Sequence, residues 1–199
     1  CTDNDDEIKS PYTNAAISSS KLLDAKQTRN TIETLIENGV IKGEIADKWL
    51  ERVNYIKNLL EKAEGGDPDA MATVAGNFVW GDNDFLRDFK MAYEWSKRAH
   101  AAGSIVGTAY LGSMLQPGCG VEQNQMMGTM YLGLAAGAGS NYAAYLLGTY
   151  LSGRDGDQAI RLLECVVNNT CKYDHLPARL KEVAQQTLAR LKEESAAGN

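Results

Sequence analysis

Apolar residues recur at helical spacing through most of the chain, and short polar or glycine-containing breaks divide them into helices. The clearest helix runs from Glu44 to Glu64 and stops at the sequence Gly-Gly-Asp-Pro over 65–68. Further helices are predicted in pairs, over about 69–80 and 88–102, 104–116 and 124–136, and 140–151 and 157–167. A last helix, opened by Pro177 and running to about Glu194, has a single apolar stripe, which is typical of the cap of a helical array.

Glycines recur along these helices at a fixed period. Gly76, Gly112 and Gly148 lie 36 residues apart, and the same interval separates Gly103 from Gly139. A period of this length is typical of a repeat array, in which each hairpin completes its core against the next.

Some of these glycines fall inside predicted helices, where Gly costs about 1 kcal/mol relative to Ala. The repetition at Gly112 and Gly148 therefore indicates that neighbouring helices approach too closely there for a larger side chain. Gly133 and Gly137 are interpreted in the same way.

The pattern predicts an all-α fold, namely a right-handed α-solenoid of about three helix-hairpin repeats with helical N- and C-terminal caps. The predicted divisions are a polar tether (1–11), an N-terminal helical cap (12–66), three repeats (67–170) and a C-terminal capping helix (171–199).

Charge is unevenly distributed. The net charge of -6 argues against nucleic acid as a partner, because phosphate contacts need a basic face. Between Ala101 and Gly153 the only charged residue is Glu122. Polar and glycine interruptions exclude a membrane span in this stretch, which instead predicts helices packed on two sides with a neutral exposed face of Tyr, Ser, Thr and Asn.

The chain has four cysteines. Cys1 begins a polar segment that resembles the start of a mature bacterial lipoprotein, whose first residue is acylated; the alternative is a chance start at a cysteine. Cys165 and Cys171 enclose five residues, a spacing that suits a disulfide in an oxidising compartment, and two buried free thiols are the alternative. Cys119 is left over, between two glycines and without an adjacent base.

The second repeat contains Ala109-Tyr110-Leu111-Gly112, Gly118-Cys119-Gly120-Val121, Tyr131 and Ala135-Ala136-Gly137. In these residues it resembles the Sel-like repeat family, relatives of the tetratricopeptide repeats. The resemblance covers about half of the chain and is weaker in the first and third repeats. Cysteine-rich members of the family link a second helix to the following helix by a disulfide, which supports the pairing of Cys165 with Cys171.

The family resemblance implies a protein-binding role. Together with Cys1, it suggests a periplasmic lipoprotein anchored to the outer membrane of a bacterium. The most concrete expectation is an immunity protein that neutralises one secreted toxic effector enzyme, such as a phospholipase. An adaptor for envelope assembly and, less favoured, a hydrolase are the alternatives.

The sequence offers residues for contact with a partner but none for chemistry. The expected partner-binding residues are Tyr142, Tyr145 and Tyr150 in the neutral stretch and Trp80, Asp82 and Asp84 in the turn of the first repeat. No nucleophile accompanies His175, so no catalytic residue is predicted. No cofactor or metal site is predicted either, because the aspartates of the turn lack the Gly and the terminal Glu of a calcium loop.

Overall fold

A computed structural model describes residues 30–83, 85–170, 173–174 and 176–197. The described residues form helices joined by turns and loops, with one isolated bridge between Ser140 and Tyr173. Residues 30–37 are helical, and the helices that follow are α2 (Glu44–Glu64), α3 (Pro68–Trp80), α4 (Phe89–Ala101), α5 (Ile105–Leu115), α6 (Gln125–Ala138), α7 (Asn141–Leu151), α8 (Gly156–Val167) and α9 (Ala178–Ala197). The predicted helices from 44 onward are thus confirmed to within a few residues at each end.

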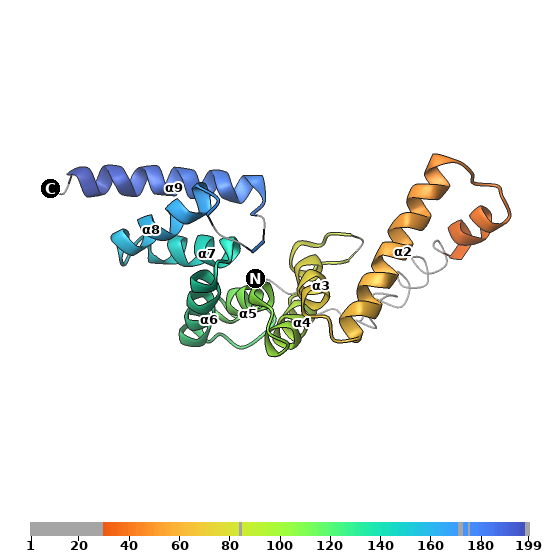
Figure 1. The fold of residues 1–199 in the computed structure, drawn as a ribbon, viewed down its shortest axis with the longest axis horizontal. Coiled ribbons are helices and arrows are strands. Elements are labelled where there is room, and N and C mark those ends of the chain that lie inside the picture. The colour runs from red at the N-terminus through yellow and green to blue at the C-terminus, as the bar shows by residue number, and fades with distance from the viewer. Residues whose placement is uncertain (1–29, 84, 171–172, 175, 198–199) are drawn as a thin grey trace.

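The helices form a solenoid of hairpins, as predicted (Figure 1). Each helix packs against the next along the chain, from α2 to α9. In addition, α3 contacts α5, α5 contacts α7, and α7 contacts α9. The first helix of each hairpin therefore belongs to one inner layer, while α4, α6 and α8 form the outer layer.

Side-chain caps define where the repeat helices begin. An Asp, Ser or Asn immediately before each helix accepts a hydrogen bond from a backbone N–H of its first turn, at Asp67, Asp88, Ser104, Asn124, Ser140 and Asp155. Gly139 ends α6 in the left-handed conformation, with φ of 103°, and Gly103 has φ of 89°. The repeated glycines of this pair thus lie at the C-terminal ends of two outer helices, α4 and α6.

The core is divided along the solenoid into three consecutive clusters. The first joins α2 to α5 around Phe78, the second joins α5 to α7 around Leu132, and the third joins α7 to α9 around Leu163. Since every cluster draws on at least two hairpins, no single hairpin buries its own apolar face.

The glycines inside helices mark close packing, as predicted for Gly112 and Gly148. A Cβ at Gly112 would lie 2.9 Å from the carbonyl oxygen of Gly128, and one at Gly148 would lie 2.9 Å from the Leu163 side chain. The same prediction for Gly133 and Gly137 is wrong, because a Cβ at either would meet no atom within 4 Å. The close approach of α6 is made by Gly128, which lies against the backbone of Gln116.

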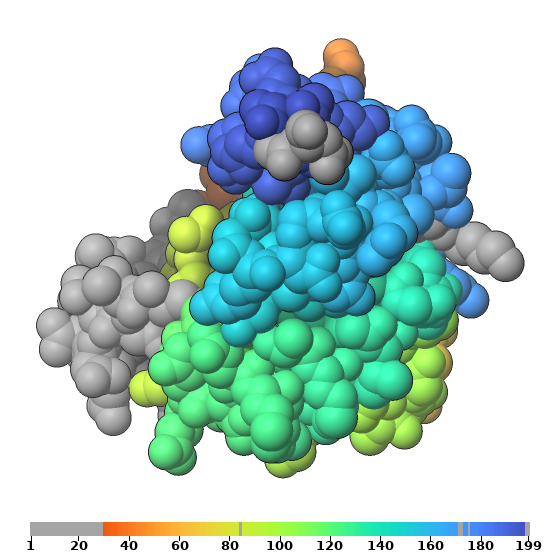
Figure 2. Space-filling view, turned by 90° about the vertical axis from the view of Figure 1, so that its left-hand side faces the viewer, coloured from red at the N-terminus to blue at the C-terminus, as the bar shows by residue number. Residues whose placement is uncertain are grey.

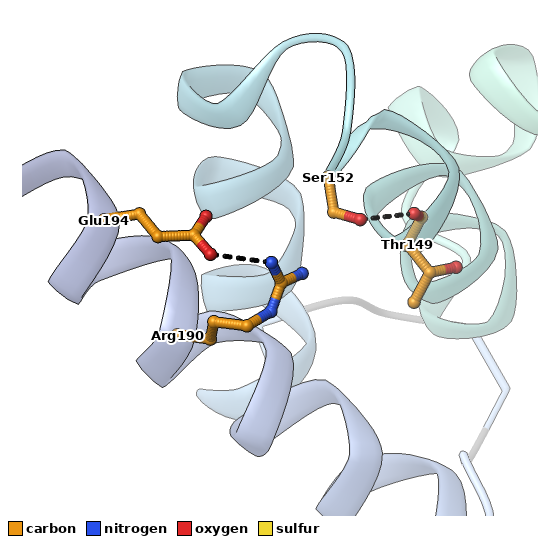
Figure 3. Close-up of polar contacts among 4 residues, drawn as sticks. All are labelled: Thr149, Ser152, Arg190 and Glu194. Atoms are coloured by element: carbon orange, nitrogen blue, oxygen red, sulfur yellow. Dashed lines mark hydrogen bonds and ion pairs between the residues drawn. The ribbon is translucent and has the colours of Figure 1, made fainter.

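The last helix closes the array mainly through apolar contacts. Ala184, Leu188 and Leu191 of α9 are buried against α7 and α8. The polar contacts drawn in Figure 3 are local: Arg190 pairs with Glu194 within α9 at 2.8 Å, and the Ser152 hydroxyl donates to the Thr149 carbonyl at the end of α7. Figure 2 shows this end of the array stacked in order, with α9 (blue) above α8 (cyan) and α8 above α6 (green).

No helix in the described ranges is long and apolar enough to cross a membrane.

We predict opposite effects of adding a methyl group at two glycines of α6. Gly128→Ala should lower the free energy of unfolding by about 1–3 kcal/mol, because the backbone of Gln116 must move. Gly133→Ala should raise it by about 0.5–1 kcal/mol, because the site is open and Ala favours the helix. Urea denaturation of the two variants measures both values, and equal effects would contradict the packing described here.

Candidate functional site

The inner layer contains a groove of about 470 Å³. It runs between α3, α5 and α7 and the segment that precedes α9. The described lining residues are Asp69, Ala72, Thr73, Gly76, Asn77, Trp80, Asp82, Val106, Tyr110, Tyr142, Asp174 and Pro177. Three of them are acidic, three are aromatic, and none is basic.

One side of the groove is a single face of α3. Asp69, Thr73, Gly76 and Trp80 follow one another at intervals of three or four residues, so they lie in line along the helix. Asp69 and Thr73 are exposed, whereas Trp80, at the far end, is half-buried. The face is therefore polar and open at its start and aromatic at its end.

Three aromatic rings meet at the centre of the groove. The Tyr142 ring contacts the rings of both Trp80 and Tyr110, with centroid distances of 5.9 Å and 5.3 Å. Gly76 makes room for this arrangement, because a Cβ there would lie 2.8 Å from the Tyr110 hydroxyl oxygen. All three rings also rest on the core, Trp80 and Tyr110 on the cluster around Phe78 and Tyr142 on the cluster around Leu132.

Burial raises the pKa of both tyrosines above its ordinary value. For Tyr110 the removal of water is the main cause; the Trp80 indole acts in the opposite direction, and the charges of Asp174 and Asp82 add to the rise in pKa. For Tyr142 burial again dominates, with an opposing effect of Ser113. Both phenols are therefore neutral near pH 7 and act as hydrogen-bonding groups.

The segment before α9 is held to the groove by Asp174. Its carboxylate accepts hydrogen bonds from the backbone N–H groups of Asn141 (2.7 Å) and Tyr142 (3.1 Å) and from the Ser140 hydroxyl (2.9 Å). The Asn141 amide donates in return to the Asp174 carbonyl oxygen at 3.0 Å. A carboxylate at the N-terminus of α7 is also favoured by the helix dipole, so this segment has a fixed position beside Tyr142.

Asn77 is a buried polar residue of the groove, with 6% of its surface exposed. Its side-chain oxygen accepts a hydrogen bond from the Asn83 amide at 3.0 Å. Its own side-chain N–H₂ group has no hydrogen-bond partner in the described part of the chain. A buried donor without a partner is costly.

The structure brings together three of the predicted partner-binding residues, namely Trp80, Asp82 and Tyr142. Asp84 lies outside the described residues. The other two, Tyr145 and Tyr150, do not line the groove. Tyr145 packs on the cluster around Leu163 and Tyr150 on the cluster around Leu132, where Arg154 covers its ring at 4.3 Å.

Sequence reasoning missed Tyr110, Asn77, Asp69 and Asp174. The first three had a detectable signal, since Asp69 and Asn77 share the helical face of Trp80, and Tyr110 lies on the next inner helix. Asp174 had none, because its place depends on hydrogen bonds to residues more than 30 positions earlier.

The predicted disulfide between Cys165 and Cys171 is wrong, because Cys165 is a free thiol. Cys165 lies on the exposed face of α8, while its neighbours Leu163 and Val166 face the core. Cys119 is instead buried and disulfide-bonded. Cys171 and the proposed lipid attachment site, Cys1, lie outside the described residues.

The described part of the chain contains no cluster of His, Cys, Asp or Glu that could hold a metal ion. A nucleophilic role for Cys119 needs a free thiolate, which the disulfide removes. His175, the candidate base of the hydrolase alternative, lies outside the described residues.

The neutral stretch between Ala101 and Gly153 does expose an uncharged surface, but the expectation that tyrosines form it is wrong. The large exposed residues there are Met126, Met127, Met130 and Leu134, which follow one face of the outer helix α6. The tyrosines of this stretch are half-buried because they face neighbouring helices. This methionine stripe (Met126, Met127, Met130 and Leu134) is a second exposed apolar surface.

The sequence matches no known protein-family profile and no curated protein. Similar solved structures include a Sel1 repeat protein from Oxalobacter formigenes, with a TM-score of 0.48 and 22% identity over 72% of this chain and 63% of that one. Another is c5321, a protective antigen present in uropathogenic Escherichia coli strains that displays an SLR fold, with a TM-score of 0.39 and 18% identity over 87% of this chain and 47% of that one.

This chain therefore spans less than two thirds of the length of either neighbour. Both are repeat proteins of the kind that the second repeat resembles. At these scores the likeness carries no argument about function, which has to come from the groove itself.

We predict that Tyr110 and Tyr142 lose their phenolic protons at a higher pH than an ordinary tyrosine does. The unfolded chain releases these protons near the ordinary tyrosine pKa of about 10, whereas the folded chain retains them. Unfolding therefore releases protons above about pH 10, and stability should fall as the pH rises through this range.

Ultraviolet titration of the phenolates measures this effect. Tyr110→Phe and Tyr142→Phe should each remove one late-titrating group from the curve. If the late part of the curve is the same in both variants as in the unaltered chain, the groove does not exclude water from these rings.

Proposed function

We propose that the chain binds one protein partner in the groove of its inner layer. The observation that carries this proposal is the meeting of Trp80, Tyr110 and Tyr142 in an open depression of about 470 Å³. Tyr and Trp are enriched among the residues that dominate binding energy, because each supplies a large, stiff contact surface with one polar atom.

The surroundings of the rings support a preformed site. The inner helices hold the rings from below, and the hydrogen bonds of Asp174 hold the segment beside Tyr142. A site whose side chains are already fixed loses little conformational entropy when a partner arrives. The methionine stripe on α6 is the competing surface.

The finer form of the proposal concerns the partner. In it, the chain is an immunity lipoprotein of the bacterial envelope, attached through a lipid on Cys1 to the outer membrane, and the partner is a secreted toxic effector such as a phospholipase. This form is supported by the resemblance of the repeats and of the first residues, and the mechanism is obstruction of the effector's active site by the docked solenoid.

We predict that a photo-crosslinking residue placed at Thr73 will link the chain to one partner protein in cells. Thr73 is exposed and lines the groove, so the substitution should leave the fold intact. The same residue at Gln185, on the exposed face of α9, should give no specific product. Crosslinking from Met130 but not from Thr73 would contradict binding in the groove and place the binding site on the methionine stripe.

The immunity form has a separate test in growth. If the linked partner is a toxic effector, its expression should stop growth, and co-expression of this chain should restore it. Thr73→Arg, which fills the groove, should abolish the rescue, while Gln185→Arg should retain it. A partner that is harmless when expressed alone would contradict the immunity form and leave binding in the groove intact.

A further inference from the structure

We propose that the groove takes an arginine side chain from an extended segment of the partner. This inference rests on the proposed function, since it specifies the chemistry of what binds in the same groove. It does not depend on the immunity role.

The charges of the groove select a cation. Asp69 lies in the first turn of α3, and Asp82 follows the end of that helix; both are exposed. No described lining residue carries a positive charge. An acidic segment would be repelled, and a purely apolar one would cover these carboxylates without pairing them, which is unfavourable.

The cation is organic. The carboxylates of the groove are spread along it, and the described residues contain no group of ligands that could hold a metal ion. About 17 Å separate Asp69 from Trp80 along α3, at about 1.5 Å per residue. A long side chain can reach from the rings to a carboxylate, whereas a bare ion cannot contact several of these groups at once.

The aromatic rings favour arginine in particular. Trp80, Tyr110 and Tyr142 form a half-buried surface at the centre of the groove. A guanidinium group is planar, stacks on aromatic faces and donates several hydrogen bonds to carboxylates. The chain itself uses this contact elsewhere, with Arg98 over the Trp95 ring at 4.1 Å and Arg154 over the Tyr150 ring at 4.3 Å.

The groove offers a hydrogen-bond donor to the backbone of the bound segment. The side-chain N–H₂ group of Asn77 lies in the wall of the groove, buried and without a partner in the described residues. A peptide carbonyl oxygen is the acceptor that an extended segment supplies at every residue. The length of the α3 face corresponds to about five residues of extended chain, at about 3.3 Å each.

The test uses the full chain, immobilised, and a random-peptide phage library as the probe. We expect the retained peptides to share an arginine and to be lost from a chain with Thr73→Arg, which places a guanidinium in the groove, but not from one with Gln185→Arg. In a synthetic copy of a retained peptide, replacing the arginine by citrulline keeps the shape and removes the charge. This replacement should weaken binding about tenfold.

A substitution in the chain, combined with the citrulline replacement in the peptide, completes a double-mutant cycle. Asp82→Asn changes an exposed residue and should weaken the arginine peptide several-fold while leaving the citrulline peptide unaffected. Circular dichroism of each variant checks that the fold is retained.

The outcomes are distinct. Groove-dependent peptides without arginine, or equal binding of the arginine and citrulline peptides, would overturn the inference and leave the proposed function standing. If the retained peptides share a lysine and bind no better with arginine in its place, the groove selects a positive charge. The inference that it selects arginine is then overturned. If no retained peptide depends on the groove, the inference fails, and linkage from Thr73 then decides the proposed function separately.

Discussion

The groove depends on one contact between inner helices, the Tyr110 ring lying against the bare backbone of Gly76. Any side chain at Gly76 would collide with the Tyr110 hydroxyl group. Because the ring occupies that place, Tyr142 of the following inner helix can lie against it, and Trp80 completes the row. The contact therefore lies where α3 packs on α5 and, at the same time, contributes to the floor of the groove.

Much of this architecture is predictable from the sequence because its causes are local. The caps at Asp67, Ser104 and Ser140 are short polar residues placed directly before apolar helical stretches, so the helix starts can be read without knowing the fold. The period of Gly112 and Gly148 likewise indicates contacts between adjacent helices, and such contacts repeat with the sequence.

The errors arise where two explanations fit the same residues. A helix without charged residues can hide its neutral side chains or expose them, and α6 exposes Met126 and Met130 while the nearby tyrosines turn inward. The spacing of Gly133 and Gly137 resembles a packing motif, yet the packing glycine of that helix is Gly128. In both cases the orientation of one helix face within the layer decides which residues are buried. The amino-acid composition of the helix does not specify that orientation.

The bonding of Asp174 has a consequence for the dynamics of the array. The segment that caps α7 and borders the groove leads directly into α9, so a ligand that contacts this segment also holds the last helix in place. Ends of solenoids open more readily than their middles. Occupancy of the groove is thus thermodynamically linked to closure of the C-terminal end, and fraying of α9 would release a bound segment without any change at the aromatic rings.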